Sequence, residues 1–145
     1  PVGSLLCGSS AFIARALRWR KVLGGGMRQA GILAAAGIYA LEHNVARLAD
    51  DHANARTLAE GLANLPGIET DPAAVQSNIV FFDIAGAGLP SHAFLQRLTS
   101  LGVRLAGSGN SVRAVTSSEV TAQDIDYALV AIRRVVGDAV PVAAG

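Results

Sequence analysis

The feature that most constrains this chain of 145 residues is an apolar run from residue 30 to residue 41. The hydroxyl of Tyr39 is its only polar side-chain group, so a helix formed here has no polar face and must be enclosed by protein. The run is shorter than the roughly 20 residues needed to cross a bilayer. We therefore expect a central helix and exclude a membrane span.

A glycine break precedes this helix. Three consecutive glycines occupy residues 24–26, directly after the cationic Arg20 and Lys21 and shortly before Arg28. Open backbone N–H groups and the positive end of a helix dipole favour an anion, and an anion would explain a cation such as Arg28 in the first helical turn. In the alternative, the glycines only end one helix and start the next. Spacing alone does not decide between them.

Composition narrows the function classes. The 12 basic and 11 acidic residues are spread along the chain and give a net charge of +1, so no electrostatic footprint for nucleic acid or an anionic membrane is present. Cys7 is the only cysteine, which excludes an intramolecular disulfide, supplies no zinc cluster and suits a reducing cytoplasm. We expect Cys7 to be a small core side chain and expect no metal site.

The first half of the chain reads as mainly helical. We expect a buried strand at residues 2–8, a helix from Ser9 or Ser10 to Lys21, and an amphipathic helix at residues 44–64. The apolar stripe of that last helix includes His52, which we assign to packing. The pairs Arg47–Asp51 and Arg56–Glu60 are spaced four apart and are expected on its exposed side.

The second half alternates strands and helices. Strands are expected at residues 68–70, 78–84, 103–106 and 111–116, and helices begin at Ser91 and Thr121. Helices over one face of such strands form a small α+β layer within an α/β protein. The predicted division is residues 1–43 as the end of a large domain, 44–65 as an interdomain helix and 66–145 as a small domain.

Arg113 is the strongest candidate for binding in that layer. It stands in a strand of small and aliphatic residues, where a guanidinium favours a carboxylate partner. In the alternative, the arginine lies at a sheet edge and extends its side chain into water.

Residues 18–37, which read Arg-Trp-Arg-Lys-x-x-Gly-Gly-Gly-Met-Arg-Gln-x-Gly-Ile-Leu-Ala-Ala-Ala-Gly, resemble the signature of the low-specificity L-threonine aldolases. These are pyridoxal-phosphate lyases of the aspartate-aminotransferase fold type. The resemblance continues through residues 42–48, 51–55, 78–82 and 112–116, so it extends over nearly the whole chain in order. Family members often carry histidine where Ser117 stands.

The resemblance implies a role for each candidate residue. Arg113 would bind the substrate α-carboxylate, Arg28 would contact the cofactor phosphate across a subunit boundary, and Lys21 would lie near the cofactor or substrate and take part in proton transfer. Lys21 is the only lysine here, yet the resemblance places the Schiff-base lysine just before Pro1. We therefore expect a C-terminal portion of an aldolase that is inactive alone.

The implied reaction is cleavage of L-threonine or L-allo-threonine to glycine and an aldehyde in the cytoplasm. The apolar helix predicts a further partner, either a homo-oligomer or the remaining N-terminal half of the enzyme. Two alternatives stay open: another pyridoxal-phosphate enzyme of this fold type, such as a β-eliminating lyase or an aminotransferase, and a non-enzymatic interaction or regulatory module.

Overall fold

The computed structural model describes residues 4–137 and divides the chain into two units, Pro1–Ala46 and Arg47–Gly145. The described residues form a mixed α/β structure of helices and one small antiparallel sheet, the fold class expected from the sequence. The helix expected at residues 44–64 forms as Leu48–Ala63 and is grouped with the second unit. The proposed three-part division of the whole enzyme remains a prediction.

The first unit consists of two helices, α1 (Ser10–Val22) and α2 (Gly31–His43). Ser9 caps α1 by accepting a 3.3 Å hydrogen bond from the Phe12 N–H. The strand expected at residues 2–8 does not form in its described part, because residues 4–9 have no regular structure. A strand needs a neighbouring backbone to pair with, and the described part of this unit offers none.

The helix at residues 30–41 forms, but it is not enclosed within this chain. None of the residues of α1 or α2 is buried, and Ile32 and Ile38 of α2 are 79% and 56% exposed. Cys7 is also exposed, so the expectation that it is a core side chain is wrong for this structure. The reason is the same for all three side chains: the described first unit provides no second layer of protein to cover them.

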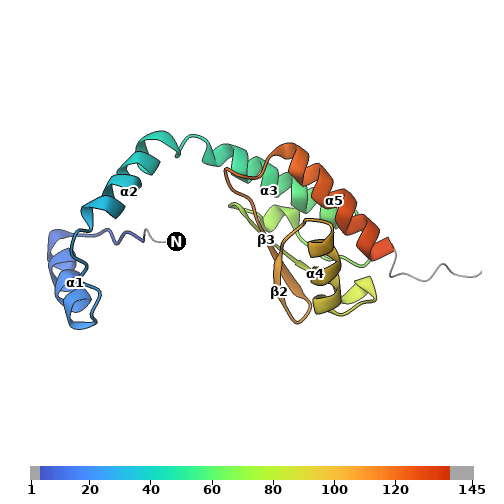
Figure 1. Cartoon of the computed structure of the whole chain (residues 1–145), viewed down its shortest axis with the longest axis horizontal. Coiled ribbons are helices and arrows are strands. Elements are labelled where there is room, and N and C mark those ends of the chain that lie inside the picture. Colours follow the sequence, from blue (N-terminus) through green and yellow to red (C-terminus); the bar gives the residue numbers. More distant parts are fainter. Residues whose placement is uncertain (1–3, 138–145) are drawn as a thin grey trace, which may run out of the picture. The chain divides into compact units, whose positions relative to one another are not determined.

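The second unit is a three-stranded antiparallel sheet covered on one face by three helices (Figure 1). Its strands are β1 (Ile79–Asp83), β2 (Ala106–Ser108) and β3 (Ser111–Val115), in the order β1-β3-β2. Its helices are α3 (Leu48–Ala63), α4 (Ser91–Ser100) and α5 (Ala122–Gly137), with short 3₁₀ turns η1 (Pro72–Ala74) and η2 (Ala85–Ala87).

Two predicted strands differ from the structure in extent. The strand expected at residues 103–106 begins only at Ala106, and the one expected at 68–70 is reduced to a single bridge between Glu69 and Asp83. β2 pairs with β3 only next to the turn at Gly109, where the register joins Ala106 to Arg113 and Ser108 to Ser111.

Alternate residues of the strands build the core. Val80 and Phe82 of β1 and Val112 and Ala114 of β3 are buried, as the period of two along a strand requires. Phe82 packs edge to face against Phe94 of α4, with ring centroids 6.4 Å apart. The helices contribute apolar residues at helical spacing: Ala55, Leu58, Ala59, Leu62, Leu98, Ile125, Ala131, Ile132, Val135 and Val136.

The buried face of α3 keeps Ala55, Ala59 and Leu62 of the expected stripe but differs from it in the first turns of the helix. His52 is exposed, and Asp51 is buried instead, at 3% exposed. The Arg47–Asp51 ion pair forms at 2.6 Å, but it is half-buried rather than on the exposed side. Arg56 and Glu60 form no ion pair among the described residues.

A hydrogen-bond cluster fixes the end of β3 to the start of α3. The Thr116 hydroxyl, which is buried, donates to the main-chain oxygen of Asp51 at 2.7 Å. The Thr116 N–H donates to the Asn78 carbonyl at 2.9 Å, and the Asn78 amide returns a 2.7 Å bond to the Thr116 carbonyl. The strand that carries Arg113 is therefore tied to both β1 and α3.

The start of α5 is a reciprocal cap. The Asp124 N–H donates to the Thr121 hydroxyl at 3.2 Å, while the Asp124 carboxylate accepts from the Thr121 N–H at 2.8 Å and from its hydroxyl at 2.6 Å. The Thr121 hydroxyl, followed by the Thr121 N–H, lowers the pKa of the Asp124 carboxyl below 3.8.

Among residues 4–137 no helix is long and apolar enough to cross a bilayer.

We expect Thr116→Val to lower the free energy of unfolding of the second unit by about 1–3 kcal/mol, because it removes a buried hydroxyl that bonds to Asp51. Urea denaturation followed by circular dichroism measures the change. Thr70→Val is the matched control, since its exposed hydroxyl also donates to one carbonyl, that of Phe81. Equal losses in both variants would contradict a stabilising role of the buried Thr116 hydrogen bond.

We expect Asp124→Asn to destabilise the fold most above pH 3.8, where the unfolded carboxyl is also ionised. A carboxyl whose folded pKa is lowered stabilises the fold above its unfolded pKa, and this contribution is lost as the pH falls through the folded pKa. The difference in unfolding free energy between the parent and the variant should therefore shrink as the solution is acidified. Asp126→Asn, further along the same helix, is the control, and a pH-independent difference for Asp124→Asn would refute the assignment.

Candidate functional site

Arg113 lies on the central strand of the sheet and on its uncovered face. β3 pairs with β1 on one side and with β2 on the other, so Arg113 is not at a sheet edge. Its neighbours along the strand, Val112 and Ala114, point into the core, while Arg113 itself is exposed. The alternative of an arginine at an edge strand is therefore wrong.

The register places Arg113 between two very different neighbours. Phe81 of β1 is paired with it on one side and Ala106 of β2 on the other. Together with Gly107, Ser108 and Ser111 they line a shallow, open hollow around the guanidinium. Sequence reasoning missed these lining residues, because finding them requires the strand register as well as the alternation.

The glycine break ends α1, whereas α2 begins only at Gly31. Gly24 has φ +78°, and the Gly24 and Gly25 N–H groups donate to the Lys21 and Arg20 carbonyls at 3.2 and 2.8 Å. This is a Schellman motif, which satisfies the last carbonyls of a helix. These two N–H groups are therefore not available to an anion.

Arg28 lies in the turn before α2 rather than in its first helical turn. The next residue, Gln29, has φ +51°, and among the described residues it is the only non-glycine residue with positive φ. A positive φ costs energy in a non-glycine residue, and residues with such a conformation cluster at binding sites. α2 then begins at Gly31 with Ala30 as its N-cap residue and no side-chain cap, so its first N–H groups face the Arg28 turn without a side-chain partner.

Lys21 lies in the last turn of α1, and its side chain lies next to Gly26 of the glycine break. A Cβ added to Gly26 would lie 3.3 Å from Lys21 Cδ and 3.6 Å from Nζ. Lys21 and Arg28 belong to the first unit and Arg113 to the second, and each is placed only within its own unit. A shared site that includes all three remains a prediction.

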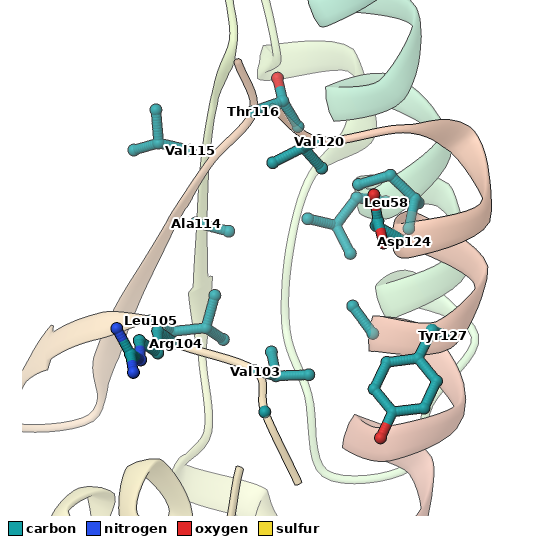
Figure 2. Close-up of a pocket in the computed structure, with 13 residues that line it drawn as sticks. Leu58, Val103, Arg104, Leu105, Ala114, Val115, Thr116, Val120, Asp124 and Tyr127 are labelled. Atoms are coloured by element: carbon teal, nitrogen blue, oxygen red, sulfur yellow. The ribbon is translucent and has the colours of Figure 1, made fainter. Parts of the chain in front are cut away.

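A separate cavity of about 250 Å³ lies between β3 and α5 (Figure 2). Its lining is mainly apolar and includes Leu58, Val103, Leu105 and Val120, with Asp124 and Tyr127 contributed by α5. Arg113 does not line it. Within residues 4–137 no three histidine, cysteine or acidic side chains form a group that could hold a metal ion.

Comparison with known proteins identifies the family of the chain. A family model described as Beta-eliminating lyase matches residues 1–85. The low-specificity L-threonine aldolase 1 of Arabidopsis thaliana is 41% identical over 131 residues, which is 89% of this chain and 37% of that protein. The low specificity L-threonine aldolase of Escherichia coli K12 is 69% identical over 62 residues, 43% of this chain and 19% of that protein.

A likeness in structure supports the fold. The crystal structure of the cysteine desulfurase CsdA from Escherichia coli matches 79% of this chain and 32% of that chain with a TM-score of 0.65, at 22% sequence identity. The chain thus spans about a third of the length of the Arabidopsis relative and of this structure. With the matched family model extending over more than half of its residues, the chain belongs to the β-eliminating lyase family.

Proposed function

We propose that this chain contributes the substrate-carboxylate arginine and a phosphate contact to a pyridoxal-phosphate aldolase. Its substrates would be β-hydroxy-α-amino acids such as L-threonine and L-allo-threonine, cleaved to glycine and an aldehyde. The observation that carries the proposal is the position of Arg113, an exposed cation in an open hollow on the fixed central strand of the sheet. The names of the relatives supply the substrate class.

Arg113 is suited to hold the α-carboxylate of an amino acid. A guanidinium forms two parallel hydrogen bonds to a carboxylate, which fixes orientation as well as position. Two fixed carboxylate oxygens together with a fixed amino group would define the direction of the bond from Cα to Cβ. Misorientation would therefore lower the rate more than the affinity.

The residues of the Arg28 turn fit a phosphate. A cation beside a helix start that lacks a side-chain cap is a favourable anion environment, and the positive φ of Gln29 shapes the backbone at that point. When bound, pyridoxal phosphate supplies the sink for the electron pair released as the Cα–Cβ bond breaks. We assign Arg28 to its phosphate group.

Lys21 would hold or move a proton near the substrate rather than anchor the cofactor. Its side chain lies next to Gly26, and Lys21 stands at the end of α1, seven residues before Arg28. Lys21 is the only lysine of the sequence, so this chain has no second lysine that could bond covalently to the cofactor. We therefore propose that the chain alone is inactive.

The exposed apolar residues of α2 support a partner. Ile32, Ile38 and Leu41 are all more than half exposed, which a helix without a polar face does not tolerate in water. We propose that the rest of the enzyme or a second subunit covers α2, in a cytoplasmic homo-oligomer. The exposure equally fits the interaction-module alternative, so it does not separate the two.

A second candidate is a β-eliminating lyase, which the description of the matched family model favours. Substrate choice separates the candidates, because both would bind an amino-acid carboxylate through Arg113. The intact enzyme containing this chain should release aldehyde from L-threonine. Faster turnover of tyrosine or aspartate would instead favour a lyase or an aminotransferase.

In that enzyme, we expect Arg113→Ala to lower kcat/KM for L-threonine by about two orders of magnitude, since two charge-assisted hydrogen bonds are lost. Arg113→Lys should recover only part of this loss, because an ammonium group does not reproduce the bidentate geometry. Arg104→Ala is the control, since Arg104 is exposed in the same unit and lies outside the hollow. Aldehyde release is measured by a coupled assay. This chain assayed alone should release no more aldehyde than the cofactor does without protein. Full activity of Arg113→Ala would exclude the assignment.

We expect Arg28→Ala to raise the dissociation constant of pyridoxal phosphate by about ten-fold, the value of one hydrogen bond to a charged group. Absorbance or fluorescence titration of the cofactor-free enzyme measures this without an activity assay. Arg15→Ala, an exposed arginine of α1, serves as the control. An unchanged dissociation constant for Arg28→Ala would place the phosphate elsewhere.

A further inference from the structure

The uncovered face of the sheet is asymmetric around Arg113. The residues of this face are Ile79, Phe81 and Asp83 of β1, Ser111, Arg113 and Val115 of β3, and Ala106 and Ser108 of β2. Arg113 is at the centre of this grid, with an aromatic ring on one side and a single methyl group on the other. The guanidinium therefore has a large side chain beside it towards β1 and open space towards β2.

Phe81 stands directly opposite Arg113 and is exposed although it is apolar. Its side chain is 60% exposed, while Phe82, the next residue, is buried in the core. Residues opposed across an antiparallel pair have Cβ atoms about 5 Å apart, within reach of an aromatic ring and an arginine stem. A guanidinium stacks on an aromatic face, which limits its rotation. The ring is thus placed to hold the Arg113 fork.

The other side of Arg113 is open and polar. Ala106 and the backbone of Gly107 fill little of the hollow, and Ser108 and Ser111 line one end of it. These two serines are directly opposed across β2 and β3, so their hydroxyls belong to one pair. A hydroxyl can donate one hydrogen bond to an anion held by the neighbouring guanidinium.

We propose that Phe81, Ser108 and Ser111 complete a carboxylate subsite around Arg113. Phe81 is a positioning residue that holds the guanidinium fork, and the serine pair donates a further hydrogen bond to the carboxylate. The proposal rests on the proposed function, because it takes the substrate to be an amino acid. It adds that selection for the carboxylate is shared by residues of three strands rather than made by one arginine.

The test compares two ligands that differ only in the carboxylate. Glycine and methylamine are titrated into the intact enzyme by calorimetry, and the ratio of their dissociation constants is measured for each variant. We expect Phe81→Ala to raise the dissociation constant of glycine about three-fold, because the guanidinium would lose the aromatic face on which we propose that it stacks. The double variant Ser108→Ala, Ser111→Ala should raise the dissociation constant of glycine about five-fold through loss of a hydrogen bond. Methylamine binding should not change, and Phe81→Tyr, which keeps the ring face, should restore glycine binding.

Ile79→Ala is the matched control for Phe81→Ala, because Ile79 lies on the same face of β1, opposite Val115, and outside the hollow. Thermal unfolding of each variant checks that the fold is retained. An unchanged ratio of glycine to methylamine affinity in the Phe81 and serine variants would overturn the subsite, as would an equal loss in Ile79→Ala. An enzyme that binds glycine selectively but does not cleave threonine would refute the proposed function and leave the subsite standing.

Discussion

The geometry of the candidate site depends on the hydrogen bonding of β3. A central strand is paired on both sides, so its backbone cannot shift without breaking two ladders. Thr116 adds a third attachment by joining the end of the strand to the first turn of α3 through the Asp51 carbonyl. Arg113 therefore has a fixed backbone and only its side chain to order, which reduces the entropy lost when it binds a carboxylate.

The first unit lacks this kind of support. None of the described residues of α1 or α2 is buried, so Lys21 and Arg28 are placed by local hydrogen bonds rather than by a core. The Schellman motif at Gly24 and Gly25 fixes where α1 ends, and the positive φ of Gln29 fixes how the chain enters α2. These local constraints are strong over a few residues. Over longer distances no core of the described residues supports the unit.

The sequence predicted the elements whose signals are local. The α5 start was visible from Thr121, and the exposed–buried alternation of β1 and β3 follows from their residues. Features set by distant contacts were not predictable in the same way. The burial of Asp51 in place of His52 on α3 depends on how the helix packs against β1 and α5. The strand expected at residues 2–8 required a pairing partner, and the pairing of Phe81 with Arg113 required a register that no single segment specifies.

The size of the residue opposite an arginine decides what the arginine can do on an open sheet face. With large side chains on both sides, the guanidinium would be packed in and its N–H groups partly covered. With small ones on both sides, it would move freely in water and bind weakly. Phe81 on one strand and Ala106 on the other give support on one side and access on the other. Replacing Ala106 by a larger residue would close the access while leaving the charge in place, so the accessibility of Arg113 is a property of all three strands.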